Sequence, residues 1–373
     1  MYTVLESIGT ANPPFRVSQP DLANFMSKVE GISTSVRNRI AGIYARSGID
    51  YRYSCLSDYG SQPEQFQFYP QNWSLQPTPT TADRNDYYRH SALEIAERAT
   101  QDAIAQSGLR AAEITHLIVV SCTGFSAPGL DIHLIKRLGL SPTIDRTLIG
   151  FMGCNAALNG FKVAHSICQS QTQARVLLIC VELCSLHFQI EDSIESVVVN
   201  ALFGDGAAAA IFSSRSSQEA QGKLAYTDGC SVLLEDTIDL MSWTIGDTGF
   251  LMGLSSDVPK VIAKHLPDYL KTFLDKHSID QEALDFWAIH PGGRQIVDQI
   301  QSSFGLSNGL VCDSYEVLRQ YGNMSSATIL FILKRLLEKH QTGLGYQNGI
   351  ALAFGPGLSI EGCLFQQVLE SSS

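Results

Sequence analysis

IGFMGCNAALNGFKVAHSIC, residues 149–168, is the part of the chain from which the fold is best argued. It starts at the end of an apolar run and passes through Gly153-Cys154. It continues with apolar residues at helical spacing from Ala157 to Cys168. This order predicts a strand, a tight turn and a helix. The Cys154 thiol would lie at the helix N-terminus, where the partial positive charge favours the thiolate.

A second stretch, in the other half of the chain, follows the same plan. The strand-like run LDFWAIH ends at His290, and a Gly-Asn pair opens a helix at Asn323. In the first half the run ITHLIVVS ends at Ser121, so 33 residues separate 121 from 154 and 33 separate 290 from 323. Apolar strands at 175–181 and 349–354 follow the two helices. The equal spacing predicts a duplicated α/β unit.

The remaining pattern is that of a layered α/β protein. Helices are predicted at 19–46 and 89–107, and an irregular segment rich in aromatic residues at 54–88. Strands that alternate with amphipathic helices are typical of folds in which helices cover the sheets. The polar stretch SSRSSQEAQG near residue 220 is the expected boundary between the halves. The N-terminal half, 1–220, then carries the Cys, and the C-terminal half, 221–373, carries the His and the Asn.

Composition narrows the class of protein. The chain has 373 residues, a formal net charge of -11 and a pI of about 5.3. The length suits two fused halves with a large core, and the acidic balance argues against a nucleic-acid partner. No apolar run is long enough for a membrane span, and the first residues lack the pattern of a secretory signal. Nine cysteines without a CxxC pair predict free thiols in the reducing cytoplasm.

Cys154, His290 and Asn323 are the predicted catalytic group. Each has a simpler interpretation when taken alone: a buried structural cysteine, a packed histidine or a helix-capping asparagine. The parallel positions in the two halves favour a common site. A thiolate nucleophile with two hydrogen-bond donors could carry an acyl group and bind a thioester oxygen as it becomes an enolate or an oxyanion.

These residues lie in motifs that resemble those of a known family. The motifs are IGTANPP, GFMGCNAALNG, NALFGDGAAA, WAIHPGGRQIVDQ, YGNMSSATILFIL and AFGPGLSIEG, and they are spread over essentially the whole chain. They are similar to motifs of the chalcone and stilbene synthases, the type III polyketide synthases. The resemblance implies a thiolase-like fold of αβαβα layers built from two duplicated halves.

The resemblance also implies residue roles. Cys154 would carry the acyl chain, while His290 and Asn323 would activate the thiolate, bind the malonyl thioester and promote decarboxylation. Phe203 matches the aromatic gatekeeper between the CoA tunnel and the cavity. The residues expected to line the acyl and cyclisation pocket are Thr123, Cys184, His187, Trp243, Met252, Phe354, Gly355 and Pro356. The residues expected to bind the CoA phosphates are Arg39, Arg46 and Arg294, with Gly42 where the family has a third basic residue.

The expected activity is that of an acyltransferase. The segment 241–259, MSWTIGDTGFLMGLSSDVP, looks like bacterial members that make alkylresorcinols or alkylpyrones. We therefore expect a homodimer that condenses a fatty acyl-CoA starter with malonyl-CoA by repeated decarboxylative Claisen condensation and then closes a ring. An acyl carrier protein is an alternative source of the starter. No metal or redox cofactor is expected.

Three other interpretations stay open at this point. One is a malonyl-CoA-primed, naphthalene-forming synthase. Another is a condensing enzyme like the ketoacyl-carrier-protein synthases, which the Pro-Gly-Gly after His290 disfavours. The third is a non-catalytic acyl-binding scaffold on a degenerate fold, which the presence of all three catalytic residue types disfavours.

Overall fold

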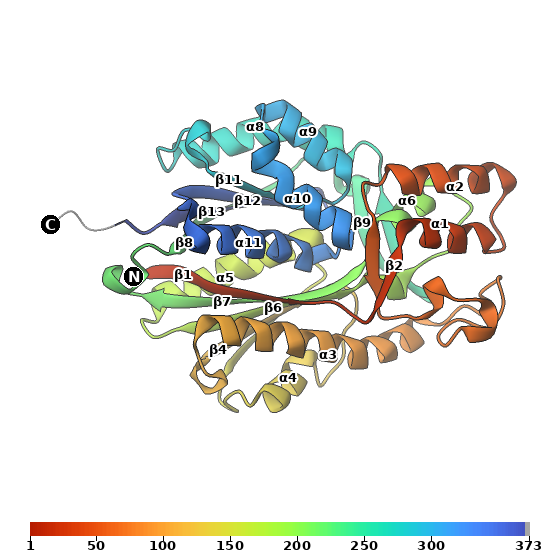
Figure 1. Ribbon diagram of the computed structural model, residues 1–373, viewed down its shortest axis with the longest axis horizontal. Coiled ribbons are helices and arrows are strands. Elements are labelled where there is room, and N and C mark those ends of the chain that lie inside the picture. Colours follow the sequence, from red (N-terminus) through yellow and green to blue (C-terminus); the bar gives the residue numbers. More distant parts are fainter. Residues whose placement is uncertain (370–373) are drawn as a thin grey trace.

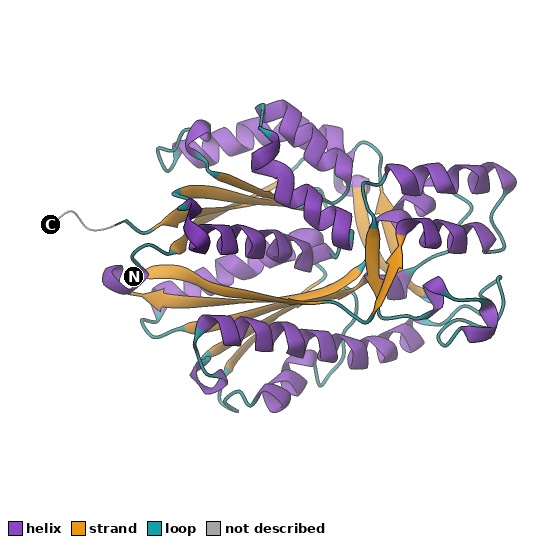
Figure 2. Ribbon diagram, in the orientation of Figure 1, coloured by secondary structure: helices purple, strands orange, loops and turns teal. Residues whose placement is uncertain are grey.

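The computed structural model describes residues 1–369 as a mixed α/β structure (Figure 2). The strands are β1 (Tyr2–Ala11), β2 (Phe15–Ser18), β3 (Tyr51–Ser54), β4 (His116–Ser121), β5 (Asp145–Gly150), β6 (Arg175–Leu183), β7 (Asp205–Arg215), β8 (Leu224–Leu233), β9 (Met241–Gly246), β10 (Gly249–Leu254), β11 (Phe286–Ile289), β12 (Asn348–Gly355) and β13 (Ser359–Gln367). The helices are α1 (Gln19–Lys28), α2 (Thr34–Arg46), α3 (Thr81–Ser107), α4 (Leu130–Leu138), α5 (Ala156–Ser170), α6 (Ile194–Leu202), α7 (Ser217–Ala220), α8 (Val258–Asp275), α9 (Arg294–Phe304), α10 (Asn308–Tyr321) and α11 (Thr328–Lys339).

Helices and strands stack in five layers (Figure 1). Helices α3 and α4 form one outer layer, α5 and α11 the central layer, and α8, α9 and α10 the other outer layer, with strands between them. Helices α1, α2 and α6 lie together at one end of the layers, beside β9. This is the thiolase-like αβαβα fold that the resemblance implied.

The strand pairing shows the duplication directly. In the first half, β4 pairs parallel with β6, and the pairs β6–β7 and β7–β1 are antiparallel. In the second half, β11 pairs parallel with β12, and β12–β13 and β13–β8 are antiparallel. A short pairing of β1 with β8 joins the two sets into one nine-stranded sheet. The predicted boundary near residue 220 falls at the end of α7, between β7 and β8.

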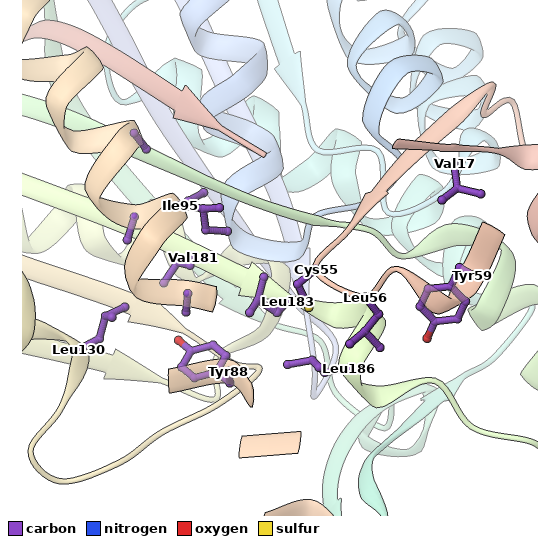
Figure 3. Packing of buried hydrophobic residues seen from close by; sticks show 14 of the residues in the cluster. Val17, Cys55, Leu56, Tyr59, Tyr88, Ile95, Leu130, Val181, Leu183 and Leu186 are labelled. Atoms are coloured by element: carbon purple, nitrogen blue, oxygen red, sulfur yellow. The ribbon is translucent and has the colours of Figure 1, made fainter. Parts of the chain in front are cut away.

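Buried apolar side chains form one large cluster for each helical layer. Figure 3 shows part of the first, where Tyr88 and Ile95 of α3 pack with Val181 and Leu183 of β6. The central cluster contains residues of α5, of α11 and of strands from both halves of the chain. The helices that follow the two predicted turns therefore share one layer. Burial of both faces explains why these strands are continuous apolar runs in the sequence.

Several elements differ from the sequence-based prediction. Helix α3 starts at Thr81, eight residues before the predicted start, because Thr80 and Asp83 form a capping box. The predicted helix at 19–46 is two helices, separated at Gly31, whose φ is +86°. No helix of the described residues has the length and hydropathy needed to cross a bilayer.

Phe161→Ala should lower the free energy of unfolding by about 3–5 kcal/mol, because the substitution leaves a cavity in the central layer. Phe161 on α5 is fully buried, and its ring lies 5.1 Å from Phe212 and 6.2 Å from Phe365. Urea denaturation would measure the change. Phe15→Ala on β2 is the matched control, because Phe15 is 38% exposed. Equal losses in the two variants would contradict the assignment of the core.

Candidate active site

Cys154 lies at the start of the central-layer helix. Gly153, Cys154 and Asn155 form a single 3₁₀ turn that leads into α5, as the Gly-Cys pair predicted. Gly153 has a φ of +81°, and a Cβ there would lie only 2.3 Å from Pro356 Cδ. Glycine is therefore required on both conformational and steric grounds. The turn leaves Cys154 8% exposed.

Asn323 and His290 come from the other half of the chain. Asn323 Oδ1 and Nδ2 lie 3.9 and 4.0 Å from Cys154 Sγ. The amide is held in place because Oδ1 accepts from Ser325 N at 2.8 Å and Nδ2 donates to Gly292 O at 3.2 Å. His290 follows β11 and is 1% exposed, and neither ring nitrogen has a hydrogen-bond partner among the described residues. Such an unpaired buried ring is free to bind a substrate oxygen.

The thiol and the imidazole are both neutral when each titrates alone. Burial raises the pKa of Cys154 to about 11, although hydrogen bonds from Ser325 and Asn323 oppose it. Burial lowers the pKa of His290 to about 3. The expected preference for a thiolate at the helix N-terminus is thus outweighed by burial. A thiolate forms most readily if His290 takes the proton, because each charge then offsets the burial of the other.

Two cavities meet at this site. The first, here called the Cys154 cavity, has a volume of about 540 Å³ and is lined by Cys154, His290 and Asn323. The second, the His187 cavity, has about 440 Å³ and is lined by Cys184, His187 and Trp243. Both are lined by Glu195, Phe203 and Met252, so these three residues lie between them. Phe203 also forms an isolated β-bridge with Asn323. This is the place expected of a gatekeeper.

The predicted CoA-binding arginines do not all reach the cavity. Arg46 and Arg294 line the Cys154 cavity and are exposed to solvent. Arg294 Nε lies 3.6 Å from Asp298, and its stem packs over Gly48. Arg39 is exposed on α2 and lines neither cavity.

Three of the predicted pocket residues also line neither cavity, whereas Phe354 lines the Cys154 cavity. Thr123 is buried, and its hydroxyl donates to Glu182 at 2.8 Å and accepts from Leu183 N at 2.9 Å. Gly355 lies where a Cβ would be 2.6 Å from the Asn155 side chain. Pro356 packs on Gly153, as described above. In this structure these three residues support the cysteine turn and the strand ends around it.

Glu182 is a site residue that the sequence reasoning did not include. It ends the apolar run of β6, is fully buried, and accepts hydrogen bonds from Thr123, Cys122 N and Ser326. Burial raises its pKa to about 7, and Ser326 opposes that shift. Its charge also raises the pKa of Cys154. A carboxylate in an otherwise apolar strand was the available signal, since buried acids need a partner or a function.

The fold, with a cysteine, a histidine and an asparagine around one cavity, is that of the thiolase-fold enzymes. Residues 2–216 and 229–369 match the family models for the N-terminal and C-terminal domains of chalcone and stilbene synthases. The chain therefore belongs to the chalcone and stilbene synthase family and is a type III polyketide synthase.

Individual relatives agree with the family models. The chain is 33% identical over 364 residues to Pks18 of Mycobacterium tuberculosis, an "alpha-pyrone synthesis polyketide synthase-like" protein. The alignment covers 97% of this chain and 90% of the relative. It is 30% identical to a putative chalcone synthase of Bacillus subtilis, over 96% of this chain and 97% of the relative. The crystal structure of PKS-I from the brown alga Ectocarpus siliculosus superposes with a TM-score of 0.94, at 37% identity and 98% coverage of both chains.

Proposed function

We propose that this enzyme loads a fatty acyl-CoA starter on Cys154, extends it with malonyl-CoA, and closes the chain to an alkylpyrone or alkylresorcinol. The observation that carries the proposal is the His187 cavity, which continues from the gate at Phe203 to the apolar side chains of Val17, Leu22 and Phe25. An alkyl tail would be buried there. The M. tuberculosis relative, named for alpha-pyrone synthesis, supports the pyrone among these products.

Loading is the first step of the proposed cycle. His290 takes the Cys154 proton, and the thiolate attacks the starter thioester, so that a new carbon–sulfur bond forms and CoA leaves as its thiol with that proton. The oxyanion formed in the attack would be stabilised by N–H donors lining the Cys154 cavity. Arg46 and Arg294 at the edge of this cavity would bind the CoA phosphates.

Extension would use Asn323 and the neutral His290 ring as hydrogen-bond donors to the malonyl thioester oxygen. The malonyl-CoA carbonyl would accept from Asn323 Nδ2 and from the N–H of the neutral His290 ring. Loss of CO₂ leaves an enolate, whose negative oxygen these donors stabilise. The enolate carbon attacks the acyl thioester, Cys154 leaves as thiolate, and the lengthened chain stays on CoA. The proposed chemistry needs no metal or redox cofactor, because decarboxylation itself supplies the carbanion.

A panel of acyl-CoA starters tests the proposal. Each starter is incubated with malonyl-CoA, and products are identified by mass spectrometry. We expect fatty starters to give alkylpyrones or alkylresorcinols at least about tenfold faster than acetyl-CoA, since each buried methylene contributes about 0.8 kcal/mol to binding. Malonyl-CoA alone is the control, and a naphthalene product from it would contradict the fatty starter. A malonyl carrier protein used in place of malonyl-CoA tests the carrier-dependent alternative.

The proposal also concerns the oligomeric state, the localisation and the donor of the starter. We expect a homodimer in solution, which the molar mass from light scattering would test. We also expect cytoplasmic localisation, and an acyl carrier protein remains an alternative donor of the starter. Comparing acyl-CoA with the same acyl group on a carrier protein would distinguish the two donors.

A further inference from the structure

Arg52 on β3 is a buried guanidinium that no carboxylate pairs with. It is 7% exposed, and no acid of the described residues lies within ion-pair distance of it. Nε donates to Gln19 Oε1 at 3.0 Å, and Nη1 donates to the carbonyl of Phe203. A buried charge held only by neutral acceptors is costly, so it needs a reason beyond packing.

The side chain is fixed in one orientation. Its stem packs on Gly322, where a Cβ would lie 2.8 Å from Arg52 Cγ and Cδ. The Phe203 carbonyl holds one end of the guanidinium directly beside the gate. Gln19 in turn donates to the carbonyl of Ala201 at 2.7 Å, so the last turn of α6 and the arginine are tied together. The remaining nitrogen, Nη2, therefore has a defined direction.

Nη2 can take a ligand oxygen beside Tyr44, with which the guanidinium also shares a side-chain hydrogen bond. It has no carbonyl or carboxylate acceptor among the described residues. Arg52 Nη2 is not one of the fully buried polar atoms that lack a hydrogen-bond partner. Nη2 of another buried arginine, Arg84, is one of them. Arg52 lines the His187 cavity and Arg84 lines neither cavity. Arg52 Nη2 is thus open to the cavity that receives the chain beyond Phe203.

Tyr44 provides a second donor at the same place. It is 2% exposed, lines the same cavity, and has its ring centroid 5.8 Å from Arg52 Cζ. Burial raises the pKa of Tyr44, while the charge of Arg52 and a hydrogen bond from Arg52 to the phenol oxygen lower it. The phenol stays protonated, and its O–H remains free to donate to a ligand. By contrast the hydroxyl of Tyr59, in the same cavity wall, already donates to Ser185 O at 2.6 Å.

We propose that Arg52 and Tyr44 bind the two oxygens of a 1,3-dicarbonyl group in the growing poly-β-keto chain. The inference rests on the proposed function, because only that chain brings oxygens past Phe203: the alkyl tail of the starter has none, and the malonyl carboxylate leaves as CO₂. The two oxygens of an enolised 1,3-dicarbonyl can accept from adjacent donors, as in bidentate recognition of a carboxylate. The guanidinium favours the enolate, whose proton passes to solvent.

A binding experiment tests the site without turnover. Nonane-2,4-dione is titrated into the Cys154→Ala protein near neutral pH, where the free diketone is not ionised, and its enolate is followed by near-ultraviolet absorption. We expect bound diketone to show the enolate band. Arg52→Gln or Tyr44→Phe should weaken binding about tenfold, the effect of losing one hydrogen bond to a charged or enolate oxygen. Arg84→Gln and Tyr59→Phe are the matched controls and should bind as the parent protein does.

Turnover gives a second readout in the same variants with Cys154 restored. The ratio of tetraketide to triketide products should fall about tenfold in Arg52→Gln and Tyr44→Phe, as one lost hydrogen bond predicts. Starter loading on Cys154, read as an intact-mass adduct, should not change. Unchanged binding and product ratio in both test variants would overturn the site, as would an equal loss in Tyr59→Phe. If Arg52→Gln does not fold, the Tyr44→Phe and Tyr59→Phe pair decides. Diketone binding without any product from acyl-CoA would reject the proposed function and leave the site standing.

Discussion

Cys154→Ala protein should form no condensation product, with activity below about one-thousandth of the parent, because loss of a nucleophile removes the covalent step entirely. The alanine keeps the buried 3₁₀ turn, so the fold and the thermal midpoint should be nearly unchanged. Incubation with the starter acyl-CoA, followed by intact-mass spectrometry, should show an acyl adduct on the parent protein and none on the variant.

Cys184→Ala is the matched control for this experiment. Cys184 is also 8% exposed, and it lines the His187 cavity but not the Cys154 cavity. We expect it to keep the acyl adduct and most of the activity, with any change confined to the products. Product formation by Cys154→Ala, or an adduct that disappears in Cys184→Ala alone, would mean that the nucleophile has been assigned wrongly.

Residues with a strong local pattern could be predicted from the sequence. Cys154 follows a strand and a glycine, and His290 ends an apolar run before Pro291, so both are marked by their own neighbours. The equal spacing to Asn323 then places all three at one place in a duplicated fold, and the structure brings them around one cavity. Their catalytic roles stay predictions until variants are assayed.

Buried charges could not be predicted in the same way. Arg52, Arg84 and Glu182 are all at most 7% exposed, yet in the sequence an arginine or a glutamate is expected on the surface. What buries them is distant in the sequence: Arg52 meets Phe203, and Glu182 meets Ser326. Sequence patterns report local periodicity and carry no information on such contacts.

The residues of the cavity wall were expected only from the family resemblance, because the local sequence pattern does not indicate them. Strand β9 has mixed exposure along its length, so it shows neither an apolar run nor a clean alternation. It is a strand because β10 pairs with it through a hairpin, and the hairpin places Trp243 and Met252 in the cavity wall. Thr123 was expected to line the pocket but does not, because its buried hydroxyl is hydrogen-bonded to Glu182.

His290→Ala should reduce condensation about a thousandfold, since the substitution removes both the acceptor of the Cys154 proton and one donor to the enolate oxygen. The effect on the thiol can be measured by itself, as the rate of Cys154 alkylation by iodoacetamide. In the variant the thiol titrates alone with a pKa of about 11, so that only about one molecule in ten thousand is thiolate at pH 7.

Because thiolate is the reactive form, the alkylation rate of the variant should rise about tenfold for each pH unit between 7 and 10. In the parent protein the imidazole accepts the proton, and alkylation at pH 7 should be at least about a hundredfold faster and depend less steeply on pH. His340→Ala is the control, because His340 is also buried but lines neither cavity, and its ring bonds to Gly222 O. If parent and His290→Ala proteins showed the same pH profile, the imidazole would not be the group that ionises the thiol, and the decarboxylation defect alone would remain to define the role of His290.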